Sequence, residues 1–149
     1  MEGSTGAWEA HPIETRCALQ KHDEIFAQKI EAHDGAIILE RGEGDSVFAV
    51  FARASDAVGA ACAIQRAIGR EAWPDQAPVR VRMAIHTGEA GADYRGPHVR
   101  RAARLRGFGH GDQILISGVS AGIVRGALPA GASLIDLGSH RLRDVAEMK

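Results

Sequence analysis

The chain has 149 residues, a formal net charge of -1, and ordinary shares of apolar (45%) and charged (25%) side chains. These values are typical of one globular domain, residues 1–149, and the net charge does not indicate a surface for nucleic acid or acidic membranes, although basic residues cluster between Arg95 and Arg106. No apolar run reaches membrane-spanning length, and the first ten residues lack the basic and apolar segments of a signal peptide. We therefore expect a cytoplasmic protein with no nucleic-acid and no membrane partner.

The first third of the chain predicts a polar loop followed by a long helix. Glu2-Gly3-Ser4-Thr5-Gly6 opens the chain as the loop, and an apolar stripe predicts a helix from about Ile13 to His33. We expect Gly35 to end this helix as its C-cap. His22-Asp23 and His33-Asp34 are three helical turns apart, so they form either a metal site or, as we favour, a solvated polar face.

The two cysteines belong to predicted helices. Cys17 falls in this first helix and Cys62 in the next, and neither is part of a CxxC pair or a Cys/His ligand pattern. We expect both to be buried free thiols in a reducing compartment.

The stretch from Ala36 to Phe51 predicts a β-hairpin. Two runs rich in Ile, Val and Phe flank the tight turn Gly42-Glu43-Gly44-Asp45. An aspartate beside a glycine at a hairpin tip points outward, and a carboxylate oxygen is the ligand that Mg²⁺ prefers. The alternative is that Asp45 is an ordinary turn residue.

The remainder predicts alternating helices and strands. We first expect a helix that begins at a Ser55 N-cap and ends near Gly69, and then a half-buried strand at Val79–Ile85. A very basic helix at Pro97–Arg106 and a buried strand at Gln113–Ile116 should follow. The last expected elements are a helix at Ser117–Val124 and a hairpin of Ser133–Leu137 with His140–Arg143. The fold class that follows is α+β, a sandwich of helices on a largely antiparallel sheet.

Several ordered segments resemble one enzyme family. They are Glu2-Gly3-Ser4-Thr5 with Trp8, Gly44-Asp45, VRVRMAIHTGEA (79–90), DYRGPHVRRAARL (93–105), GDQILIS (111–117) and LGSHRLRDV (137–145). Together they resemble the catalytic domain of class III adenylate and guanylate cyclases, in the bacterial branch that opens with F-T-D-I-E-G-S-T. The resemblance implies a ferredoxin-like cyclase sandwich.

The same resemblance implies a reaction. Such domains convert ATP, or GTP, into the cyclic nucleotide and pyrophosphate by attack of the ribose 3′-hydroxyl on the α-phosphorus. Two aspartates hold two Mg²⁺ or Mn²⁺ ions, and a head-to-tail homodimer completes each site. The chemistry depends on positioning and charge neutralisation.

Matching positions suggest roles for individual residues. Asp45 falls on a metal aspartate, the loop of Glu2, Gly3, Ser4 and Thr5 on the phosphate-facing backbone, and Arg104 on the arginine that stabilises charge on the α-phosphate. Four further residues match substrate or catalytic positions: Arg41 and Asp93 at the purine contacts, Arg143 at a triphosphate contact, and Arg100 at the ribose-orienting position.

Some of these residues have plainer alternatives. Arg41 and Arg143 are equally explained as surface charges on strands, and Asp93 as a turn residue. Arg104 shares a basic helix face with Arg100, which would repel itself without an anion nearby, so a phosphate role is favoured.

The sequence departs from the family at both ends and at one site residue. The family's central first strand, with its first metal aspartate, falls before Glu2, and the last strand falls beyond Lys149. Arg100 stands where active relatives have asparagine, and arginine cannot accept a hydrogen bond. A misplaced start codon or a decayed domain explains the first departure, and the intact Glu2-to-Thr5 loop favours the former.

These departures leave three functional hypotheses. The first is an adenylate cyclase domain that is weak or inactive as it stands. The second is a non-catalytic pseudo-cyclase that binds nucleotide or dimerises in signalling. The third is a fragment without independent function.

Overall fold

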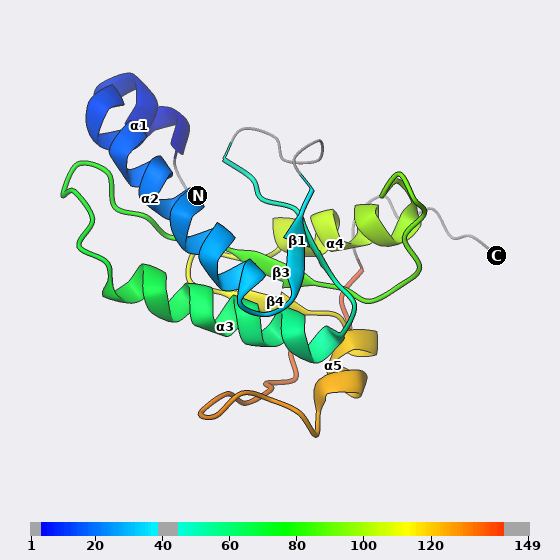
Figure 1. Cartoon of the computed structure of the whole chain (residues 1–149). Helices are drawn as coiled ribbons and strands as arrows, with labels where there is room; N and C mark the ends of the chain where they lie inside the picture. The colour runs from blue at the N-terminus through cyan, green and yellow to red at the C-terminus, as the bar shows by residue number, and fades with distance from the viewer. Residues whose placement is uncertain (1–3, 39–44, 142–149) are drawn as a thin grey trace.

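The computed structural model describes residues 4–38 and 45–141, and in this part the fold is mixed α+β (Figure 1). Five helices and four short strands occur there in the order α1 (Ser4–Ala10), α2 (Pro12–Glu31), β1 (Gly35–Ile37), β2 (Ala49–Phe51), α3 (Ala54–Arg70), β3 (Met83–Ile85), α4 (Pro97–Gly107), β4 (Ile114–Ile116) and α5 (Gly118–Val124). Among these helices, none has the length and apolar character that crossing a membrane requires.

The start of the described chain is a helix, so the prediction of a loop is wrong for Ser4 and Thr5. Glu2 and Gly3 lie outside the described residues. His11 separates α1 from α2 with φ −140° and ψ 71°, because the residue before a proline avoids the helical region. The hydroxyl of Thr15 donates to the carbonyl of Ala7 over 2.9 Å, which ties the two helices together.

The end of α2 differs from the prediction at Gly35. The helix is capped at Ala32, and Asp34 rather than Gly35 adopts the left-handed conformation, with φ 56°. Gly35 is instead the first residue of β1. The ring of Phe51 occupies the space that a Cβ atom at Gly35 would need, so a glycine is required there by packing and not by capping.

The four strands form two separate pairs. β1 and β2 are antiparallel, with Gly35 opposite Phe51, which confirms the hairpin, although its tip (39–44) lies outside the described residues. β3 and β4 are parallel, with Met83 opposite Ile114. A largely antiparallel sheet is therefore the wrong description, because only one of these two pairs is antiparallel. The family-specific sandwich stays a prediction.

The core lies where α2, α3 and the segment leading into β3 meet. Figure 1 shows α2 and α3 in front of β3 and β4. α3 begins after Arg53, so the predicted N-cap Ser55 lies inside the helix, whereas its end at Arg70 agrees with the prediction. The alternation predicted before β3 is confirmed, since two valines are buried. The main buried cluster is Ala18, Ile25, Ile30, Ile64, Ile68, Ala77, Val79 and Val81.

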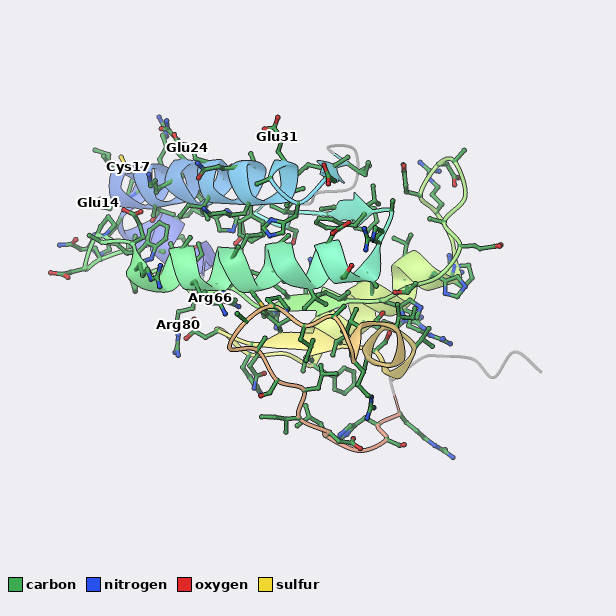
Figure 2. All side chains as sticks on the ribbon, turned by 60° about the horizontal axis from the view of Figure 1, so that its bottom comes forward. Glu14, Cys17, Glu24, Glu31, Arg66 and Arg80 are labelled. Carbon is green, nitrogen blue, oxygen red and sulfur yellow. The ribbon has the colours of Figure 1, made fainter. Side chains whose placement is uncertain are left out.

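The two cysteines are free but not buried as predicted. Cys62 is partly exposed and Cys17 is exposed. Figure 2 shows Cys17 on the outer side of α2, together with Glu14, Glu24 and Glu31. A thiol on this polar face has no packing role.

The last described segment contains no strand between residues 126 and 141, so the predicted strand Ser133–Leu137 is wrong. A turn does occur there, since the Gly138 N–H donates to the Asp136 carboxylate over 2.8 Å and Gly138 has φ 78°. The side chains of Ile135 and Leu137 remain exposed. The predicted second half of this hairpin was His140–Arg143; His140 and Arg141 are not in a strand, and Arg143 lies outside the described residues.

Packing of α3 on the core should dominate stability. Ile64 is 3% exposed, and truncation to alanine should lower the free energy of unfolding by about 3 kcal/mol, through lost burial and a residual cavity. Ile123 is 58% exposed, so Ile123→Ala is the control and should change stability little. Urea denaturation monitored by circular dichroism measures both, and equal effects would contradict this core assignment.

Candidate functional site

A groove of about 1010 Å³ lies between β2 and β3, enclosed by faces of α2, α3 and α4. Its walls include residues 45–54, which contain β2, and residues 81–88, which contain β3. Asp45 is the first residue of the first wall, on the side of the hairpin that leads into β2. This groove brings together the predicted metal ligand and the basic helix, so it is the candidate site.

Asp45 lies near a positively charged side chain. Its Oδ2 atom is buried. On the neighbouring residue, the Ser46 hydroxyl accepts a hydrogen bond of 3.1 Å from the guanidinium of Arg106. Arg106 thus carries positive charge from α4 to the residue next to the carboxylate. A carboxylate and a guanidinium at one end of a groove suit a ligand that combines cation and phosphate.

His22 of α2 also borders this groove. It is 1% exposed, its Nδ1 donates to the Asp23 carboxylate over 2.9 Å, and its ring packs on Phe26 with centroids 4.4 Å apart. Burial lowers the pKa of His22, while the hydrogen bond to Asp23 and the charge of Asp45 oppose that shift. The prediction of a solvated polar face is therefore wrong for His22.

The alternative metal site on α2 gains no support. The ring of His33 donates to the carbonyl of Lys29 over 2.8 Å. Within residues 4–38 and 45–141 no three His, Cys, Asp or Glu side chains are grouped so that they could hold a metal ion.

Helix α4 presents one face to the groove. Pro97 is its first residue, and Gly96 precedes it with φ 153°, a value that favours glycine. The lining residues of this helix are His98, Val99, Arg100, Ala102, Ala103 and Arg106. Arg104 is not among them, so within one chain Asp45 shares the groove with Arg100 and Arg106. The predicted role of Arg104 across a dimer stays a prediction.

Arg106 is the residue that the sequence reasoning missed. The signal was present, because Val99, Ala102, Ala103 and Arg106 recur at spacings of three and four and so share one helix face. Because Arg106 is the last residue of this otherwise apolar stripe, its charge lies at the end of the surface that the stripe covers.

The other predicted site residues lie apart from this groove or outside the described chain. Asp93 is exposed and its carboxylate accepts from the Arg95 N–H over 3.0 Å, as expected for a turn residue. A smaller hollow of about 330 Å³ follows it, lined by Tyr94, Arg95, Gly96, Val99 and Arg100. Glu2, Gly3, Arg41 and Arg143 lie outside the described residues.

A hydrogen-bonded network of polar side chains lies at the end of the second wall where His86 and Thr87 are. His86 hydrogen-bonds to the Ser117 hydroxyl over 2.9 Å and to the ring of His98 over 3.0 Å. The hydroxyls of Ser117 and Thr87 both reach Ser120, over 3.1 and 2.8 Å. Burial lowers the pKa of His86, and the charges of His98 and Arg101 act in the same direction. This network therefore favours a neutral His86.

Comparison with known proteins shows only a distant similarity to cyclases. No family model matches it. It is 40% identical over 146 residues to an uncharacterized protein of Mycobacterium tuberculosis, covering 96% of this chain and 49% of that protein. It is 28% identical over 145 residues to an adenylate cyclase of Podospora anserina, covering 78% of this chain and 7% of the cyclase.

A second fungal enzyme gives the same result. The chain is 25% identical over 177 residues to an adenylate cyclase of Neurospora crassa, covering 100% of this chain and 8% of that protein. The chain is thus distantly similar to fungal adenylate cyclases. It spans about half the length of the mycobacterial relative at 40% identity.

The histidine network should make stability sensitive to acid. The pKa of His86 is lower in the folded protein than its ordinary value of 6.5, so the unfolded chain binds a proton more readily. The contribution of His86 to the free energy of unfolding is complete above pH 6.5. It decreases as the pH falls through the pKa that His86 has in the folded protein. His86→Gln should reduce this loss in urea denaturation at pH 7.5 and pH 5.0.

His110 provides the control, since it is exposed and outside the network. His110→Gln should retain the pH dependence of the unsubstituted protein. If His86→Gln and the unsubstituted protein lose the same stability between the two pH values, His86 is not the responsible group.

Proposed function

We propose that this chain is a nucleotidyl cyclase domain of the class III type that binds ATP, with Mg²⁺ or Mn²⁺ on its phosphates, at the Asp45 end of the groove. The observation that carries the proposal is the meeting of Asp45 with the α4 arginines in one groove, in a chain distantly similar to adenylate cyclases. GTP is the alternative substrate of the same class.

The described residues suggest how the nucleotide would be bound. Asp45 would supply one oxygen ligand to the ion that arrives with the triphosphate. Arg100 and Arg106 line the same groove and would balance the phosphate charge, for which a guanidinium fork is well suited. Phe48 and Tyr94 meet edge to face, with ring centroids 6.3 Å apart, and offer apolar surface to a purine.

The reaction we propose is attack of the ribose 3′-hydroxyl on the α-phosphorus, with pyrophosphate as the leaving group. The bound cations would supply charge neutralisation and activate the hydroxyl. Arg104 would stabilise the charge on the α-phosphate from the partner subunit of a homodimer, since it does not line the groove of its own chain.

A second candidate is a pseudo-cyclase that binds nucleotide without turnover. Arg100 favours it, because a guanidinium in the groove attracts phosphate but has no acceptor with which to orient a ribose hydroxyl. Product formation separates the two candidates.

Replacing the Asp45 carboxylate should weaken nucleotide binding. Asp45→Asn keeps the size of the side chain but removes its charge, and the affinity for Mn-ATP should fall about tenfold, equivalent to about 1.4 kcal/mol. Calorimetric titration measures the affinity, and a cyclic AMP assay on the same samples measures turnover.

The matched control is Asp75→Asn, at an exposed aspartate in the loop after α3. It should bind Mn-ATP as the unsubstituted protein does. Equal affinities for Asp45→Asn and Asp75→Asn would remove Asp45 from the site. Tight binding without cyclic AMP in the unsubstituted protein would identify the pseudo-cyclase.

The shared site can be tested by mixing variants. Arg104→Ala should lower cyclic AMP formation about a hundredfold with little change in Mn-ATP affinity, as expected for an arginine that acts on the transition state. Arg106→Ala should weaken binding, because Arg106 lies in the groove of its own chain. The exposed Arg125, as Arg125→Ala, is the control for both.

Mixing Asp45→Asn with Arg104→Ala should restore activity, because a mixed dimer contains one site with both residues intact. A site contained in a single chain would give no recovery. The mixture therefore distinguishes a shared site from an internal one.

A further inference from the structure

The α4 side of the groove carries several hydrogen-bond donors but very few acceptors. The residues of this helix that line the groove are His98, Val99, Arg100, Ala102, Ala103 and Arg106. Valine and alanine have no polar side-chain atom, and a guanidinium group has donors only. Of the groove-lining residues that the structure describes on α4, His98 is therefore the only one whose side chain can accept a hydrogen bond or a proton.

The ring of His98 is held through its Nδ1 atom. This atom lies 3.0 Å from Nε2 of His86. A Cβ atom at Gly88 would overlap the Nδ1 edge of the His98 ring, so the glycine makes room for the ring in this position. No hydrogen bond joins Nε2 of His98 to another group of the described chain. The nitrogen on the far edge of a firmly held ring is thus left for a ligand.

The hydrogen bonds behind His98 decide whether this second nitrogen carries a hydrogen. Nδ1 of His86 bonds to the Ser117 hydroxyl over 2.9 Å, and that hydroxyl bonds to the buried Ser120 hydroxyl over 3.1 Å. Each neutral ring and each hydroxyl has one hydrogen to donate, so all the donors point the same way along this network. If they point from His98 toward Ser120, Nε2 of His98 keeps its lone pair.

The charges around the network favour that direction. Arg100 and Arg106 line the groove beside His98, and Arg101 lies close enough to His86 to act on its ring. The α5 segment, 118–124, has no charged residue and offers only hydroxyls. A positive field on the groove side stabilises a lone pair that faces it and opposes an N–H in the same position.

The place of His98 in the groove matches the ribose of a bound nucleotide, an argument that rests on the proposed function. His98 precedes Arg106 by eight residues, which is about 12 Å along the helix at about 1.5 Å per residue. The proposed phosphate contacts are Arg100 and Arg106, and the proposed purine contacts are Phe48 and Tyr94. The ribose joins these two parts, so it falls in the stretch that His98 lines.

We propose that Nε2 of His98 accepts a hydrogen bond from the ribose 3′-hydroxyl and acts as the general base of the reaction, with His86 as the positioning residue that holds the ring. The proton moves from the 3′-oxygen to Nε2, and the electron pair of that oxygen forms the bond to the α-phosphorus. The bond from the α-phosphorus to the bridging oxygen breaks, and pyrophosphate leaves with its electron pair. The proton then passes from His98 to water. His98 thus supplies the acceptor that Arg100 lacks.

The contact can be tested with nucleotides that differ in one hydroxyl. Calorimetry on the full chain compares the manganese complexes of ATP, 3′-deoxy-ATP and 2′-deoxy-ATP. The unsubstituted protein should bind ATP about fivefold more tightly than 3′-deoxy-ATP, as expected for the loss of one neutral hydrogen bond. The ligand control is 2′-deoxy-ATP, whose affinity relative to ATP should be the same in every variant.

Two variants assign this preference to the histidine pair. His98→Phe keeps a planar ring against Gly88 but removes its nitrogens, so it should bind ATP only as tightly as 3′-deoxy-ATP. It should also lower cyclic AMP formation about a hundredfold. His86→Leu leaves His98 in place without its partner and should reduce the preference. His110→Phe, at an exposed histidine outside the network, is the control and should retain it.

A measurement on the unsubstituted protein covers the case in which His98→Phe does not fold. Nitrogen resonances of the histidine rings, recorded by nuclear magnetic resonance, report which ring nitrogen carries a hydrogen. Mg-ATP should shift the resonance of His98 Nε2, whereas Mg-3′-deoxy-ATP should shift it much less. The His110 resonances should not respond to either nucleotide.

Several results would overturn the proposal. They are equal affinities of the unsubstituted protein for ATP and 3′-deoxy-ATP, a preference that survives in His98→Phe, and an Nε2 resonance that responds alike to both nucleotides. Cyclic AMP formation that His98→Phe retains, or a preference without any cyclic AMP, would reject the general base. If these tests fail while Mn-ATP binding depends on Asp45, the role of His98 is wrong and the proposed nucleotide site stands. Absence of Mn-ATP binding would overturn both.

Discussion

The packing of α2 against α3 is the constraint on which the rest of the described structure depends. Ile25 and Ile30 of α2 meet Ile64 and Ile68 of α3 in the buried cluster. Ala60 and Ala61, at 1% and 5% exposure, allow the backbone of α3 to approach its neighbours closely. Since β1 follows α2 directly and β2 precedes α3, the position of this helix pair also fixes the hairpin and the carboxylate at its end.

The helix pair holds two strand pairs that do not bond to each other in the described chain. The β1–β2 pair is continuous with the helices, while the β3–β4 pair is attached through the buried Val79 and Val81 and through α4. The groove is the space between them. Edges that face such a space are a risk for unwanted pairing unless something covers them. The proposed nucleotide site would use the end of this groove at which the charged side chains lie.

Helix α4 connects the two ends of this groove. Its start lies against the His86 network, where the His98 ring packs on His86 with centroids 5.2 Å apart. Its last turn carries Arg106 to Ser46. A shift of α4 would therefore change the polar network and the charge beside Asp45 together. The hydrogen bond between the two rings needs one ring nitrogen as acceptor, and burial lowers the pKa of His86, which favours its neutral form.

Much of the fold followed from local patterns. The apolar stripe of α3, the strand alternation at Val79 and Val81, and the hairpin at Ala36–Phe51 were all predictable, because burial on one face imposes a period of 3.6 or 2 on the sequence. The errors at Gly35, Ser55 and Ser133–Leu137 concern ends of elements and an isolated strand. There neighbouring chain decides the outcome, as the Phe51 ring does at Gly35.

For the site, the sequence by itself determined the chemical types: a carboxylate at a hairpin end, a basic helix, and segments that resemble a nucleotidyl cyclase. Only the tertiary structure decided which of these groups meet. It placed Arg106 rather than Arg104 in the groove with Asp45, buried His22, which also borders the groove, and brought residues of β2 and β3 to the same space. Spacing along one helix or strand fixes which face a residue occupies. Which faces meet depends on how separate elements pack, and no local pattern contains that information.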